Sequence, residues 1–223
     1  MSWLKRLPIH YSGELHDVRL INFSVVREEI SPKLPASIKL RDFNGRAMIS
    51  MVDVKLKNMH PVAFPWVRFN YRHVAFRVLV DDGRYNGGVC KGIFFLKSFS
   101  DKPLIVVGGN VMTDYNLEAA SIAEQNGMVT ITQNERYVKY GLDDSEPEEQ
   151  PVLRNTIGAL DRAYSVLHGN LRVTEIQREK WPIREVNCEV FKNTFFKTAR
   201  FEGAFRVFET IYYEWLSPKV IKQ

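Results

Sequence analysis

The sequence of 223 residues contains only two cysteines, Cys90 and Cys188, which are too few and too far apart for a disulfide framework or a zinc site. Its five histidines show no metal-ligand spacing. No apolar run approaches the roughly 20 residues of a membrane-spanning helix, and the first residues lack the apolar stretch of a secretory signal. We therefore expect a cytoplasmic protein with no metal site and no membrane contact.

Concentrated positive charge is also missing. The 31 Lys and Arg residues exceed the 26 Asp and Glu residues, for a formal net charge of +5, but they are scattered along the chain. Nucleic-acid binding usually shows a clustered basic patch, so nucleic acid is not an expected partner. The glycine pairs Gly87-Gly88 and Gly108-Gly109 lack the residues of a phosphate loop or a dinucleotide fingerprint, and there is no Gly-x-Ser-x-Gly elbow. We expect no cofactor.

What is abundant is apolar and strand-like sequence. Apolar residues make up 45%, with 14 Phe, 9 Tyr and 4 Trp, which is enough for a substantial core. Turn signals such as Asn44-Gly45, Asp82-Gly83 and Asn126-Gly127 separate strand-like segments. Helical signals are sparse: a short turn within residues 27–35 and one helix over residues 152–164. This pattern predicts a single domain over residues 1–223, mainly β (β-rich α+β), as a closed or nearly closed antiparallel β-barrel with a few short helices.

Two further segments carry expectations about exposure and pairing. Met48, Val52, Val54 and Leu56 alternate with Asp53, Lys55 and Lys57, so one face of that strand is predicted to be buried. Residues 171–192 are predicted to form paired strands broken near Trp181-Pro182, and we interpret this break as a packed corner.

The most informative segment is the strand predicted over residues 71–80. With a period of two, Tyr71, His73 and Arg77 lie on one side, and the apolar residues Val74, Phe76, Val78 and Val80 lie on the other. The polar side either faces water or lines a cavity. Because inward and outward residues alternate in a barrel, all three could share one lumen. Arginine, tyrosine and histidine could together bind a carboxylate.

The order of four segments resembles the bacterial YqjF-like family of unknown function, whose fold is that of acetoacetate decarboxylase. These segments are Asp42-Phe43-Asn44-Gly45-Arg46-Ala47, residues 71–80, Gly92-Ile93-Phe94-Phe95-Leu96, and residues 171–176 followed by Trp181-Pro182-Ile183. The resemblance implies an acetoacetate decarboxylase-like barrel.

Two departures from the family pattern bear on chemistry. The family strand has Glu and Asn where this chain has His73 and Ala75, and only Arg77 is kept. Acetoacetate decarboxylase works through a Schiff-base lysine, which follows a Val-Gly-Arg-Glu segment. The nearest equivalent here is Val107-Gly108-Gly109-Asn110, and the lysine position holds Asn116 or Leu117. Because an imine requires an amine nucleophile, the resemblance implies a chain without this reaction.

The preferred hypothesis is therefore a barrel that binds a small, anionic organic ligand without Schiff-base chemistry. Tyr71, His73 and Arg77 would be its polar contacts, with Phe94 and Phe95 in the walls. Glu175 is a further candidate for the site, unless it is an internal acid that pairs with Arg77, a role also open to Glu118.

Two alternatives remain open. The first is a divergent decarboxylase, aldolase or dehydratase that acts on a small oxo acid through a relocated lysine, Lys91 or Lys97. The second is a structural or interaction module whose interior is filled by side chains, with the polar side of residues 71–80 facing solvent. A homo-oligomer is possible because sheet edges and aromatic residues need covering.

Overall fold

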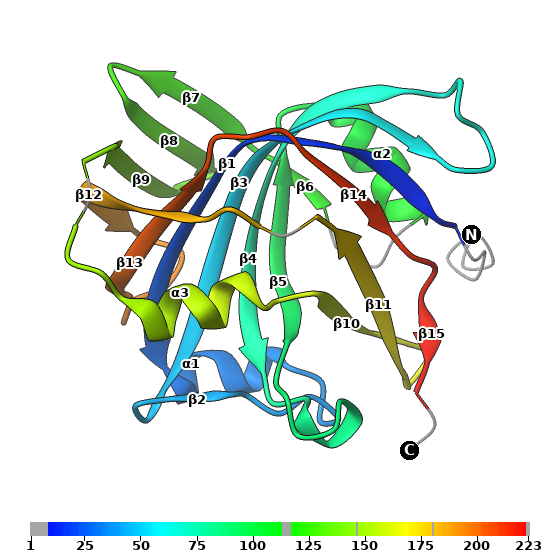
Figure 1. The fold of residues 1–223 in the computed structure, drawn as a ribbon, viewed down its shortest axis with the longest axis horizontal. Helices are drawn as coiled ribbons and strands as arrows, with labels where there is room; N and C mark the ends of the chain where they lie inside the picture. Colours follow the sequence, from blue (N-terminus) through cyan, green and yellow to red (C-terminus); the bar gives the residue numbers. More distant parts are fainter. Residues whose placement is uncertain (1–8, 113–116, 146, 180, 222–223) are drawn as a thin grey trace.

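The described strands form one sheet, part of which closes into a barrel (Figure 1). The computed structural model describes residues 9–112, 117–145, 147–179 and 181–221. The strands are β1 (Tyr11–Val26), β2 (Asp42–Phe43), β3 (Arg46–Pro61), β4 (Phe69–Val80), β5 (Gly92–Ser100), β6 (Leu117–Ala119), β7 (Ser121–Gln125), β8 (Met128–Gln133), β9 (Arg136–Asp143), β10 (Arg162–Leu167), β11 (Asn170–Arg178), β12 (Arg184–Asn193), β13 (Arg200–Val207), β14 (Ile211–Trp215) and β15 (Lys219–Val220). The α-helices are α1 (Arg27–Ile30), α2 (Pro103–Met112) and α3 (Pro151–Gly158), and short 3-10 turns lie at η2 (Ser31–Lys33) and η3 (Gly83–Tyr85).

Seven of the described strands close the barrel, in the order β1, β3, β4, β5, β10, β11, β14 and back to β1. The predicted mainly-β barrel with a few short helices is confirmed. The expected antiparallel arrangement is wrong at β5, which runs parallel to both β10 and β6. The chain leaves the end of β5 and returns to the start of β10 only after residues 101–161, and such a crossover yields a parallel pair.

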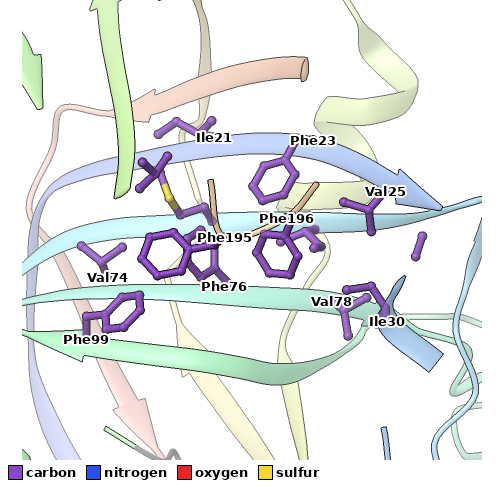
Figure 2. Close-up of a cluster of buried hydrophobic side chains, with 14 of the residues drawn as sticks. Ile21, Phe23, Val25, Ile30, Val74, Phe76, Val78, Phe99, Phe195 and Phe196 are labelled. Atoms are coloured by element: carbon purple, nitrogen blue, oxygen red, sulfur yellow. The ribbon is translucent and has the colours of Figure 1, made fainter. Parts of the chain in front are cut away.

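A second group of strands extends from β1, in the order β13, β12, β9, β8, β7. It covers the outer face of β1, β3 and β4, and the core between the two layers is apolar with a cluster of phenylalanine rings, which we call the aromatic core (Figure 2). The ring of Phe76 on β4 lies with its centroid 5.2 Å from both Phe195 and Phe196 and 5.9 Å from Phe99. These edge-to-face and tilted contacts pack the barrel wall against the second layer.

Both faces of β4 are therefore enclosed. Val74, Phe76 and Val78 face the aromatic core, as the alternation predicted. Ala75 and Leu79 belong to a second apolar cluster on the other side of the strand, inside the barrel. The inner face is consequently the side on which Tyr71, His73 and Arg77 lie.

The prediction that Asp53 on β3 lies on an exposed face is wrong. The residue is only 1% exposed because the second layer covers that side of the strand. Its carboxylate accepts two hydrogen bonds from Arg72, at 2.8 and 2.6 Å, and another from the Tyr140 hydroxyl. The bidentate pair compensates for the loss of water around both charges.

Other boundaries differ from the sequence prediction. The helix expected over residues 152–164 ends at Gly158, and β10 begins at Arg162. The strands β11 and β12 lie on either side of the predicted break, but β11 pairs with β10 and β14, whereas β12 pairs with β9 and β13. The turns at Asn44-Gly45 and Asn126-Gly127 are confirmed, each with positive φ at both residues. No helix in the described part of the chain is long and apolar enough to cross a membrane.

Candidate functional site

The barrel encloses a cavity of about 320 Å³. Its wall is built by inward-facing residues of β1, β3, β4, β5, β11 and β14, together with α2, the first residue of β6 and the segments around residues 160 and 181. Most of these residues are apolar. They are Leu15, Val18, Val52, Val54, Leu56, Met59, Phe69, Ile93, Phe95, Leu104, Ile105, Gly108, Gly109, Leu117, Leu160, Ile176 and Trp215. The polar or partly polar lining residues are Tyr11, Tyr71, His73, Arg77, Arg178, Trp181 and Tyr213.

Arg77 contributes a buried positive charge to this wall, with only 6% of the residue exposed. Its Nε donates a hydrogen bond to the Ser50 carbonyl oxygen at 3.3 Å, and its Nη2 donates to the Ser50 hydroxyl at 3.0 Å. Within the described part of the chain, no carboxylate pairs with it. Burial, and secondarily the charge of Arg178, lower the pKa of Arg77 to about 9.

Arg178, at the end of β11, is a second cation on the wall. Its Nη2 donates to the carbonyl oxygens of Gly158 and Leu160, at 3.1 and 2.8 Å. The guanidinium carbon lies 4.1 Å from the centre of the Trp181 ring. Burial lowers the pKa of Arg178 to about 10, and Asp161 partly opposes that shift. The hydrogen bonds of the two guanidinium groups thus go to neutral acceptors, three carbonyls and a hydroxyl, and of the two groups the charge of Asp161 acts on Arg178 alone.

Two further polar atoms of the lining residues are buried without a hydrogen-bond partner in the described structure: His73 Nε2 and Trp181 Nε1. Burial, and to a smaller extent Arg77, lower the pKa of His73 to about 4, so its imidazole is neutral at pH 7. Burial raises the pKa of Tyr71, which keeps its hydroxyl protonated. A buried group without a partner costs free energy, and a ligand could supply the missing hydrogen bonds.

The structure brings together Tyr71, His73 and Arg77 on the cavity wall, together with Phe95. It does not bring Phe94 or Glu175 there. Phe94 is on the opposite side of β5 from Phe95 and packs against the aromatic core. The side chain of Glu175 is 41% exposed and pairs with Lys219 at 3.2 Å, so it is not a partner of Arg77.

The two candidate lysines lie elsewhere. Lys91 pairs with Asp161 at 3.1 Å, and Lys97 pairs with Glu118 at 2.9 Å. Neither lysine lines the cavity.

The segment that corresponds to the family's lysine region does border the cavity. Gly108 and Gly109 in α2 line it, as does Leu117 at the beginning of β6. Asn116, the other candidate for the lysine position, lies outside the described residues. The described lining contains no lysine, so none of the described residues offers an amine for an imine in this cavity.

Sequence reasoning missed Arg178 as a site residue and assigned Trp181 to a packed corner. A usable signal existed in β11, where a period of two places Arg178 on the same side of the strand as Ile176, which lines the cavity. Applied there, the period-two argument used for β4 would have put Arg178 on an inward face. Among the described residues, no group of three or more His, Cys, Asp or Glu side chains is placed to hold a metal ion.

Comparison with known proteins shows the family of this chain. The profile of the DUF2071 family, described as an uncharacterized conserved protein (COG2071), matches residues 12–216, so the chain belongs to that family. The resemblance to a bacterial family of unknown function, drawn from the sequence, is therefore confirmed. None of the curated proteins compared with the sequence matches it.

Solved structures show the same fold at low sequence identity. An acetoacetate decarboxylase-like enzyme from Sphingomonas wittichii RW1 is 12% identical with a TM-score of 0.65, over 97% of this chain and 94% of that one. Acetoacetate decarboxylase from Legionella pneumophila is 11% identical with a TM-score of 0.61, over 96% and 87%. The enduracididine biosynthesis enzyme MppR, complexed with pyruvate, is 12% identical with a TM-score of 0.58, over 96% and 90%. The acetoacetate decarboxylase-like fold is therefore established.

Proposed function

We propose that this protein binds a small organic anion, a carboxylate, inside its barrel and does so without Schiff-base chemistry. The observation that carries the proposal is a pair of arginines, the buried Arg77 and the partly buried Arg178, which face one cavity with no carboxylate in its described lining. A buried charge without a counter-charge is costly. A bound carboxylate would supply that counter-charge, and guanidinium groups match its planar geometry.

The neutral polar groups of the lining support the same proposal. Trp181 Nε1 is an unused donor, and the Tyr71 hydroxyl lines the same cavity. His73 Nε2 is unused as well and can donate or accept according to its tautomer. Pockets with a few convergent polar groups in apolar walls are typical of small-molecule sites. MppR, which shares the fold, was solved in complex with pyruvate, a small carboxylate.

The placement of Lys91 and Lys97 disfavours the enzyme hypothesis. Each amine is paired with a carboxylate, and neither reaches the described cavity wall. A Schiff base forms only where the amine reaches the carbonyl carbon of the substrate, which a lysine outside the cavity does not do. The cavity likewise disfavours a barrel filled entirely by side chains.

Tryptophan fluorescence tests the proposal because Trp181 and Trp215 line the cavity. The protein is titrated with benzoate, hexanoate and pyruvate, and with benzamide and hexanamide as neutral analogues. We expect saturable binding of at least one carboxylate and much weaker binding of its amide. The substitution Arg77→Met should weaken carboxylate binding about tenfold or more, since it removes a charge-assisted contact.

Arg200→Met is the matched control, because it makes the same change at a side chain that is 74% exposed and lies outside the cavity. Equal binding of acid and amide, or equal loss in both variants, would contradict the proposal. Borohydride reduction in the presence of pyruvate, followed by intact-mass measurement, tests the lysine alternative. A stable adduct on Lys91 or Lys97 would establish that alternative in its place.

A further inference from the structure

The extent of the apolar cavity wall restricts the class of carboxylate that fits this site. We infer that the ligand is an amphipathic carboxylate, whose head binds at Arg77 and Arg178 and whose hydrocarbon or aromatic body extends towards α2. This inference rests on the proposed function and narrows its ligand class. It separates this chain from a site for a short oxo acid.

The cationic groups occupy one region of the wall. Arg178 is close enough to Arg77 for its charge to lower the pKa of Arg77, and Trp181 stacks on Arg178. The charge of Arg77 also contributes to the lowered pKa of His73. Together these residues form a polar region, which we call the head site.

The rest of the lining is apolar and extends well beyond the head site. On β4, Phe69 and Arg77 both line the cavity and are eight residues apart, which corresponds to about 26 Å along a strand. Beside Phe69 the wall continues through Met59 and Leu56 on β3. A short oxo acid at the head site would leave this apolar surface without contact, whereas a long apolar body would cover it.

The helix α2 is where the cavity reaches solvent. Leu104 lines the cavity, yet it is 87% exposed. Gly108 also lines it, and a Cβ atom added there would meet no other atom within 4 Å. Space is therefore left beneath this helix. Two adjacent glycines also weaken a helix, by about 1 kcal/mol each relative to alanine, which suits an element that must yield when an apolar chain enters.

Calorimetric titration with straight-chain carboxylates from acetate to decanoate, and with pyruvate, tests the inference. Each methylene that becomes buried should tighten binding about fourfold, until the cavity is filled and the gain stops. The substitution Gly108→Leu should fill the space beneath α2, so the gain should stop at a shorter chain while acetate and butyrate are unaffected. Val107→Leu, at an exposed position of the same helix that does not line the cavity, is the matched control and should leave the series unchanged.

The outcomes separate this inference from the proposed function. Carboxylates that bind through Arg77 with no gain from chain length would overturn the amphipathic ligand and leave anion binding intact. A gain with length that Gly108→Leu does not shorten would overturn the placement of the body beneath α2. If no carboxylate binds, or if alcohols of equal length bind as well as the acids, both the inference and the proposed function fail.

Discussion

At the scale of single residues, Arg77 is held in surroundings that suit a charge poorly. Its hydrogen bonds go to one residue, Ser50, and the charge that contributes to its lowered pKa is another cation, Arg178. Neutral partners recover only part of the hydration that a buried guanidinium loses. The free protein therefore contains a local cost that a bound anion would relieve.

Arg77→Met should consequently make the free protein more stable, even though it weakens ligand binding. We expect the free energy of unfolding to rise by about 1–3 kcal/mol, because an apolar side chain of similar length replaces a buried charge. Urea unfolding of both proteins without ligand measures this difference. A loss of stability instead would show that the hydrogen bonds to Ser50 outweigh the cost of the charge.

His73 should make stability depend on pH on the acidic side. Its pKa is lowered to about 4 in the folded state, against an ordinary value near 6.5. Between these values the unfolded chain binds a proton that the folded protein does not, so stability falls as pH decreases from 6.5 to 4. The loss amounts to about 3 kcal/mol at most.

The variant His73→Leu should lose this part of the pH dependence. Urea unfolding at pH 6.5, 5.5 and 4.5 should give a flatter profile than the unaltered protein. His168→Leu is the control, since His168 lies in an exposed turn between β10 and β11. Parallel profiles for the unaltered protein and His73→Leu would contradict the role of His73.

At the scale of elements, the second layer of strands is joined to the barrel by charge as well as by aromatic packing. Asp53 on β3 accepts hydrogen bonds from Arg72 on β4 and Tyr140 on β9. Arg72 and Arg19 both also bind Glu124 on β7, at 3.0 and 2.7 Å. The barrel wall and the second layer therefore share one network of hydrogen bonds and ion pairs, which is buried at Asp53 and Tyr140 and reaches the surface at Glu124.

Asp53→Ala should be severely destabilising, by about 3–5 kcal/mol, because it leaves Arg72 without its buried partner. Tyr140→Phe removes only a hydroxyl and should cost about 1 kcal/mol. Chemical unfolding of both variants measures the two changes. Similar, small losses in both would show that the aromatic core alone joins the layers.

Features fixed by neighbours in the sequence could be predicted well. The alternation in β4 correctly separates Val74, Phe76 and Val78 from Tyr71, His73 and Arg77, because side chains alternate in any strand. The turns at Asn44-Gly45 and Asn126-Gly127 could also be predicted, since positive φ is a local requirement.

Features that depend on distant segments could not be predicted in the same way. The burial of Asp53 depends on Tyr140, and one parallel partner of β5 is β10, whose paired residues lie 70 positions further along the chain. Arg178 and Trp181 were not assigned to the head site because their position beside Arg77 also depends on contacts between distant segments. The alternation in β4 shows which residues share a face, but it does not show that Arg178 faces them across the barrel.

At the scale of the whole molecule, the ligand should stabilise the barrel, since most of the barrel strands contribute to the wall of the cavity. A carboxylate at 100 times its Kd should raise the free energy of unfolding by about 2.7 kcal/mol. This effect should weaken above about pH 9, where free Arg77 loses its proton and binding requires that the proton be regained. Affinity should then fall about tenfold per pH unit.

Thermal unfolding with and without hexanoate, at pH 7, 9 and 10, measures this dependence. In Arg77→Met the dependence near pH 9 should disappear, and what remains should begin nearer pH 10, where Arg178 loses its proton. A shift in Tm that is the same at pH 7 and pH 10 would contradict a role for these guanidinium groups.

The closure of the barrel has a consequence for synthesis. The first strand, β1, is flanked by β3 and by β14, so the seam closes only when Ile211–Trp215 returns to residues near the N-terminal end of β1. During translation β1, β3, β4 and β5 can already pair through hairpins, while the cavity still lacks Tyr213 and Trp215. Contacts this distant along the chain form slowly. A nascent chain therefore has no complete cavity, and its open edge needs protection until β14 has left the ribosome.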